Sequence, residues 1–125
     1  MPLPYPSIKP CPCGSGRSYA SCCQPAHSGA APQTPEALMR SRYSAYVLQD
    51  EAYLLATWHP DTRPDGLDLT DGTRYLGLRV HGAEGDKVSF TATLRLPDGQ
   101  RAQLREHSTF TRLNGRWVYL EGTAP

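Results

Sequence analysis

The chain has 125 residues, enough for one ordinary domain with a small appendage. Its 13 lysines and arginines balance 12 aspartates and glutamates, so no overall field favours nucleic acid or an anionic membrane. With 38% hydrophobic residues the chain can build a core, and no apolar run approaches the roughly 18 residues of a membrane span. The proline-rich start, MPLPYPSIKP, lacks the apolar segment of a signal peptide, so we expect a cytoplasmic protein.

All the cysteines fall within the stretch CPCGSGRSYASCC. They are Cys11, Cys13, Cys22 and Cys23. Disulfides explain this pattern poorly, because Cys22 and Cys23 are neighbours and a cytosolic compartment keeps thiols reduced. The glycines of GSG let the backbone reverse after Cys13, since glycine tolerates positive φ. The following RSYASCC predicts a short helix that brings Tyr19, Cys22 and Cys23 to one face.

Metal binding explains the cysteines better. Two thiolates from the loop and two from the helix can close a tetrahedron, which favours zinc with Zn–S bonds of about 2.3 Å; iron is the chemically allowed alternative. Because four protein ligands leave no open position, we expect a structural rather than a catalytic site. Lys9 and Arg17 would offset part of the roughly −2 charge of a zinc tetrathiolate. His27 could replace Cys23 as a ligand, but a surface histidine is the simpler expectation.

CPCGSGRSYASCC resembles the SEC-C motif, a small zinc knuckle also found at the C-terminus of the SecA translocation ATPase. Cys23 stands where that motif carries either His or Cys. LMRSRYSAYVLQDEAYLLATWHP and REHSTFTRLNGRWVYLEGTAP resemble the YchJ family of bacterial proteins. This resemblance implies a SEC-C knuckle followed by a nuclear-transport-factor-2-like domain, in which a curved sheet wraps around a helix to form a cone. We therefore divide the chain into a knuckle (1–24), a linker (25–34) and a cone domain (35–125).

Two helices are predicted after the linker. Thr34 is a predicted N-cap and Pro35 the first residue of a helix over 35–49. Asp50 is predicted to cap a second helix, EAYLLATW, which ends near His59 because Pro60 disfavours helix in the residue before it. On the wheel of the first helix, the apolar stripe consists of Leu38, Met39, Tyr43, Tyr46 and Val47. Arg40, Ser41 and Ser44 lie outside that stripe.

The second half of the chain alternates between apolar and polar residues, as strands do. TRYLGLRVHG and KVSFTATLRL are the first two predicted strands, and PDG at 97–99 and NG at 114–115 predict hairpin turns. These turns pair Phe90 with Glu106 and Phe110 with Tyr119 in a four-stranded antiparallel meander. The fold class is therefore α+β, with short helices packed on a curved antiparallel sheet, which agrees with the resemblance.

Following the turns through the sheet places two carboxylates, Glu106 and Glu121, on its apolar face. Buried carboxylates are costly unless they are paired. Arg42 lies inside the apolar stripe of the first helix, so we predict a buried ion pair between Arg42 and one of these glutamates. The functional alternative is a polar pocket at the open end of the cone; its candidate residues are Arg42, Tyr46, Trp58, His59, Glu106, Tyr119 and Glu121. A register error that leaves the glutamates exposed is the third alternative.

The opposite face of the sheet carries mostly polar and charged residues. It includes Arg95, Arg101, Arg105 and His107, with Val118 and Leu120 as apolar exceptions. Domains of the resembled fold often pair through this face, so homodimerisation is left open.

Three functions fit these features. The first is a metal-binding adaptor whose knuckle docks on a protein or ribonucleoprotein partner, which the resemblance associates with translation or secretion. The second is a small isomerase, hydrolase or dehydratase that uses the carboxylate pocket. The third, nucleic-acid binding through the knuckle and the outer arginines, is disfavoured by the balanced charge. We favour the adaptor, assign no catalytic residue and expect no membrane association.

Overall fold

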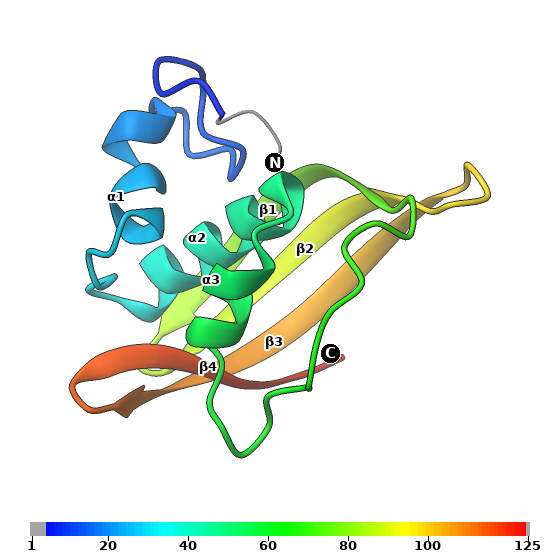
Figure 1. Cartoon of the computed structure of the whole chain (residues 1–125). Coiled ribbons are helices and arrows are strands. Elements are labelled where there is room, and N and C mark those ends of the chain that lie inside the picture. The colour runs from blue at the N-terminus through cyan, green and yellow to red at the C-terminus, as the bar shows by residue number, and fades with distance from the viewer. Residues whose placement is uncertain (1–4, 125) are drawn as a thin grey trace.

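The computed structural model describes residues 5–124. The fold is α+β: a four-stranded antiparallel sheet of order β1-β2-β3-β4 curves around one central helix, α2 (Figure 1). In chain order the elements are η1 (Tyr19–Ser21, a 3₁₀ turn), α1 (Gln24–His27), α2 (Pro35–Leu48), α3 (Glu51–Ala56), β1 (Arg74–Glu84), β2 (Lys87–Arg95), β3 (Arg101–Leu113) and β4 (Arg116–Thr123). Among the helices of this part of the chain, none is long and apolar enough to cross a membrane.

The two predicted helices of the cone domain are confirmed, and their caps explain their bounds. Thr34 Oγ1 accepts a hydrogen bond from the Ala37 amide at 3.1 Å at the start of α2. Gln49, in the left-handed conformation with φ of 59°, ends that helix. Asp50 then caps α3, because its carboxylate accepts from the Tyr53 amide at 3.1 Å.

The predicted register of the sheet is confirmed at both hairpins. Phe90 lies opposite Glu106 in the β2–β3 pair, and Phe110 lies opposite Tyr119 in the β3–β4 pair. The β3–β4 turn uses Asn114 and Gly115, both with positive φ (54° and 81°), as a two-residue hairpin of this kind requires. The turn chemistry of the sequence therefore fixes which side chains of β2, β3 and the start of β4 face the helix.

A bulge in β4 overturns one expectation. Phe110 pairs with Tyr119 while the preceding Thr109 pairs with Glu121, so Leu120 is an extra residue in β4. Because one extra residue exchanges the two faces of the strand beyond it, Glu121 shares the outer face with Thr109 and is exposed. The prediction that Glu121 lies on the apolar face is therefore wrong.

The free edge of β4 is covered by the chain that follows α3. The His59 amide donates to the Tyr119 carbonyl at 2.8 Å, and Thr62 Oγ1 donates to the Leu120 carbonyl at 2.6 Å. Val118 is buried and Leu120 is half-buried. These two outer-face residues consequently do not form an exposed apolar patch.

Helix α2 is buried on two sides. Towards the sheet, Leu38 and Met39 pack with Val88 and Phe110 in one cluster. On the other side α2 contacts α1, which stands at the start of the predicted linker, and the blue N-terminal segment lies alongside (Figure 1). A second cluster joins the knuckle to the cone domain; its buried members are Cys11, Cys13, Tyr19, Cys23, Tyr43 and Ala92. The knuckle is thus packed on the cone domain.

Candidate functional site

The four cysteines form a cluster that fits a tetrahedral metal ion. The sulfur atoms of Cys11, Cys13, Cys22 and Cys23 all lie within 4.8 Å of one another. A tetrahedron with metal–sulfur bonds of about 2.3 Å has sulfur–sulfur edges of about 3.8 Å. The Cys13–Cys22 and Cys22–Cys23 sulfur separations are 3.5 and 3.9 Å. The donor set is therefore already arranged for an ion of the size of zinc.

Local backbone structure explains why the cysteines meet. The Cys11 amide donates to the Arg17 carbonyl at 2.9 Å, and the Gly14 amide donates back to the Cys11 carbonyl at 3.1 Å. Gly14 and Gly16 take positive φ values of 76° and 87°, which allow this tight reversal. The predicted short helix is a three-residue 3₁₀ turn, η1, that ends where Cys22 and Cys23 begin.

The thiols of the cluster compete for negative charge. Hydrogen bonds from Cys13 and Cys23 lower the pKa of Cys11 to about 3. The pKa of Cys23 is raised above its ordinary value, first by its hydrogen bond with Cys11, then by its hydrogen bond with Cys13 and by burial. The Cys11 thiolate is thus stabilised while the ionisation of Cys23 is opposed. A bound cation removes this conflict, since it allows all four sulfurs to ionise together.

Two serine hydroxyls contact the sulfur atoms. Ser44, on the buried knuckle side of α2, donates to the Cys23 sulfur at 3.2 Å and lies 3.6 Å from the Cys11 sulfur. Ser15 lies 3.1 Å from the sulfur of Cys22, the one ligand that is not fully buried. Hydrogen bonds of this kind orient metal ligands and stabilise their charge.

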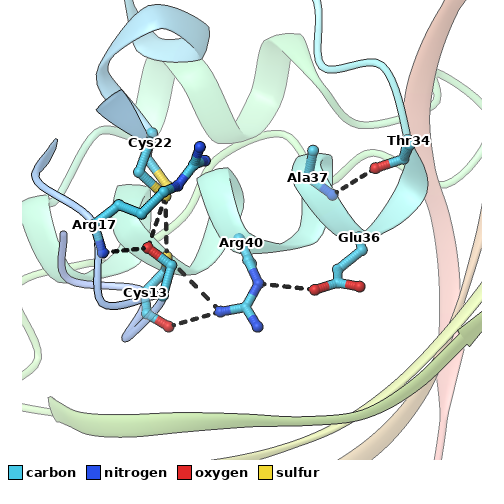
Figure 2. A network of polar contacts seen from close by, with 9 residues as sticks. Cys13, Arg17, Cys22, Thr34, Glu36, Ala37 and Arg40 are labelled. Atoms are coloured by element: carbon cyan, nitrogen blue, oxygen red, sulfur yellow. Dashed lines mark hydrogen bonds and ion pairs between the residues drawn. The ribbon is translucent and has the colours of Figure 1, made fainter. Parts of the chain in front are cut away.

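Arg40 brings a positive charge to the cluster from α2. Its Nη1 donates to the Cys13 carbonyl at 3.2 Å and lies 3.9 Å from the Cys13 sulfur, while its Nε donates to the Glu36 carboxylate at 3.0 Å (Figure 2). The sequence pointed instead to Lys9 and Arg17 as the compensating cations. Both are exposed, and Arg17 lines a surface hollow beside Cys22.

His27 is neither a ligand nor a free surface residue. Its Nε2 lies 2.8 Å from the Ser41 carbonyl, so Nε2 is the donor, and Nδ1 accepts from the Tyr19 hydroxyl at 2.6 Å. The ring thereby joins the knuckle to α2. The expectation of a surface histidine is wrong, because α1 carries His27 back onto the main helix.

The pocket predicted in the cone domain exists between α2 and the sheet. It is a cavity of about 300 Å³, and five of the seven candidate residues line it: Arg42, Tyr46, Trp58, Glu106 and Tyr119. Its walls also include Met39, Tyr43, Tyr75, Phe90, Ala92, Leu104, Ser108 and Phe110. Glu121 is excluded by the bulge in β4. His59 is excluded because its backbone pairs with β4 and its Nδ1 accepts from the Asp61 amide at 3.0 Å.

The predicted ion pair between Arg42 and a glutamate is wrong. Arg42 Nη1 donates to the Leu54 carbonyl at 2.8 Å and to Thr57 Oγ1 at 2.7 Å, so neutral oxygens of α3 and its C-cap engage it. Within residues 5–124, no carboxylate oxygen lies within 4.0 Å of its guanidinium. Burial lowers the pKa of Arg42.

Glu106 has its own partners in the cavity wall. Its carboxylate accepts from Ser108 Oγ at 2.5 Å and from the Tyr119 hydroxyl at 3.4 Å. Burial, and then the Glu106 charge, raise the pKa of Tyr119 above its ordinary value. Gly122, on the neighbouring strand β4, leaves room for this arrangement, because a Cβ there would overlap the Glu106 carboxyl group.

Sequence reasoning missed the groups that support the metal site: Arg40, Ser44 and Ser15. A signal was present, since Arg40, Ser41 and Ser44 lie together outside the apolar stripe of α2. Two serines and an arginine on one face of a helix indicate that this face packs against a second, polar segment of the chain. Ser41 and Ser44 are indeed buried.

Comparisons with known proteins agree with this description. Residues 34–122 match the family described as "YchJ, middle NTF2-like domain", and residues 9–25 match the SEC-C motif. A UPF0225 protein of Deinococcus radiodurans is 64% identical over 94% of this chain and 91% of its own length. A UPF0225 protein of Streptomyces coelicolor is 48% identical over 98% of this chain and 97% of its own length.

Two solved structures have the same fold. The solution structure of a SEC-C motif containing protein from Rhodopseudomonas palustris is similar with a TM-score of 0.80 and 37% identity, over 92% of this chain and 98% of that one. The crystal structure of a SEC-C motif containing protein from Psychrobacter arcticus gives a TM-score of 0.72 and 29% identity, over 95% of this chain and 84% of that one.

Proposed function

This chain belongs to the YchJ (UPF0225) family, and we propose that it is a metal-binding interaction protein whose knuckle docks on a protein partner. The metal we propose is zinc, because four clustered thiolates with tetrahedral spacing suit zinc best; iron is the alternative. We place the protein in the cytoplasm, where thiols stay reduced and free to bind the ion. Four protein ligands leave no coordination position for a substrate, which supports a structural role for the metal.

The observation that carries the docking proposal is a surface hollow beside the metal site. It lies between the knuckle and the start of α2, with Ser15, Arg17, Cys22 and Cys23 on one wall and Thr34, Glu36, Ala37 and Arg40 on the other. Because the metal ligands build one wall, we expect the hollow to keep its shape only when the metal is bound.

The chemistry of this surface favours a partner with an acidic segment. Arg17 and Arg40 line the hollow, and Glu36 already pairs with Arg40. As the resemblance of the knuckle implies, we expect a protein or ribonucleoprotein of translation or secretion.

The experiment compares matched forms of the protein as bait in an extract, followed by binding measurements with each purified candidate partner. The forms are the metal-loaded chain, the chelated chain, Arg17→Glu and, as a control on the far sheet face, Arg101→Glu. We expect a partner that binds the loaded chain and Arg101→Glu but loses affinity for Arg17→Glu and the chelated chain. A partner whose affinity is the same for all four forms would contradict docking through the knuckle.

The enzymatic alternative predicted two carboxylates, Glu106 and Glu121, in the cavity. Only Glu106 lines it among the described residues, because Glu121 is exposed. Homodimerisation through the outer sheet face stays a prediction, which sedimentation velocity of the metal-loaded chain would test.

A further inference from the structure

Arg42 is a buried cation that faces a cavity. Arg42 is only 5% exposed. Its guanidinium carbon lies 4.8 Å from the centre of the Trp58 ring and 4.7 Å from the centre of the Tyr119 ring. Its acceptors from α3 and the C-cap of α3 are both uncharged. A buried charge is costly unless a counter-charge compensates it. Among the described residues no carboxylate is close enough to form an ion pair with Arg42; the charge of Glu106, in the same cavity, acts on it only from a longer distance.

The guanidinium has donors beyond those that α3 engages. Its hydrogen bonds to Leu54 and Thr57 both come from Nη1, and the Tyr46 hydroxyl is a further polar neighbour in the cavity wall. The N–H groups of Nε and Nη2 point in parallel, so together they can donate to both oxygens of one carboxylate. Because Arg42 lines the cavity, a ligand carboxylate inside it can meet these N–H groups.

The rest of the cavity suggests the body of the ligand. Its walls are mainly aromatic and aliphatic, with Tyr46, Phe90 and Phe110 among them, and Leu104, at 46% exposed, marks an opening to solvent. Glu106 and Ser108 lie on the sheet side, so a hydrogen-bond donor on the ligand would find an acceptor there. A volume of about 300 Å³ lies at the lower end of ligand pockets, which suits a molecule of amino-acid size.

We propose that this cavity is a binding site for a small carboxylate with an apolar side group, held by Arg42, and with a donor group directed at Glu106. Amino acids and hydroxy acids with aromatic or branched side chains have this chemistry. The site is separate from the knuckle, so its occupation does not depend on the docking function proposed above.

A matched set of probes tests the charge requirement on the unmodified, metal-loaded chain. Phenylacetate and phenylacetamide have nearly the same shape and differ in the carboxylate, and L-phenylglycine adds an ammonium group to the carbon skeleton of phenylacetate. In titrations followed by amide NMR, we expect phenylacetate to bind at least about tenfold more tightly than phenylacetamide, since a charge-assisted bidentate contact is lost. We expect L-phenylglycine to bind more tightly than phenylacetate, and Glu106→Gln to remove that difference. Equal binding of acid and amide, or no binding of either acid at millimolar concentration, would overturn the proposal.

Two leucines provide a matched test of location. Leu104 lines the cavity, while Leu76, at 44% exposed, does not. We expect Leu104→Trp to abolish phenylacetate binding and Leu76→Trp to preserve it. Arg42→Met should also abolish binding, and its amide spectrum shows directly whether the fold is kept. If Leu104→Trp binds phenylacetate as tightly as the unmodified chain, the ligand lies elsewhere and the assignment of the cavity fails. Arg17→Glu, the knuckle variant, should leave phenylacetate affinity unchanged, which separates this test from that of docking.

Discussion

Replacing Arg40 with methionine should weaken metal binding without unfolding the protein. Arg40 sits on α2, 24% exposed in its side chain, with Nη1 at 3.2 Å from the Cys13 carbonyl and 3.9 Å from the Cys13 sulfur. Groups that contact metal ligands in this way are typically worth tenfold to hundredfold in affinity. The long sulfur contact and the partial exposure place Arg40 at the lower end, so we expect about a tenfold rise in the metal Kd, or about 1.4 kcal/mol.

The assay is competition for zinc between the protein and a chromophoric chelator, at low and at high salt. Arg17→Met is the matched control, because Arg17 is exposed and donates no hydrogen bond to a sulfur atom in the described structure. Its Kd should change much less, and high salt should narrow the gap between Arg40→Met and the unmodified chain. A Kd for Arg40→Met within about twofold of the unmodified chain would refute the reasoning, as would an equal loss in Arg17→Met.

Three further results are expected. Gly122→Ala should lower the free energy of unfolding in urea by about 0.5–1.5 kcal/mol, because its Cβ displaces the Glu106 carboxyl group from its hydrogen bonds with Ser108 and Tyr119, whereas Gly77→Ala, which has open space, should change it by less than about 0.5 kcal/mol. His27→Ala should cost about 1–3 kcal/mol in the same assay, since the Tyr19 hydroxyl and the Ser41 carbonyl lose their partner; a loss no larger than that of the exposed His107→Ala would contradict the bridging role. Burial raises the pKa of Tyr43 and Tyr75 from 10.0 to about 12, so the folded state holds these two protons more tightly than the unfolded chain does. The stability that they contribute should be complete below pH 10 and lost as pH rises through about 12, which circular dichroism together with the ring NMR signals of these two tyrosines would follow; ionisation of Tyr43 and Tyr75 near pH 10 in the folded protein would contradict it.

Much of the fold could be predicted because its signals are local. A capping threonine followed by proline, and an Asn-Gly pair between alternating strands, determine the start of α2 and the β3–β4 hairpin within a few residues of chain. The four cysteines likewise lie in one short segment, so their meeting follows from two glycines and a 3₁₀ turn.

The failures concern contacts set by distant parts of the chain. The bulge at Leu120 turns Gly122 rather than Glu121 inward, against the Glu106 carboxyl group. We expected Arg42 to pair with a carboxylate, but it donates hydrogen bonds to the Leu54 carbonyl and the Thr57 hydroxyl at the end of α3 instead. Neither the return of α3 onto α2 nor the bulge is visible in the periodicity of a single strand or helix.

The central claim is that four thiolates hold one metal ion that fixes the knuckle on α2. The most direct measurement is the metal content of protein purified without added metal, together with thiol titration before and after chelation. We expect about one zinc ion per chain, with thiols that react only after the ion is removed. A chain without metal and with four freely reactive thiols would contradict the claim.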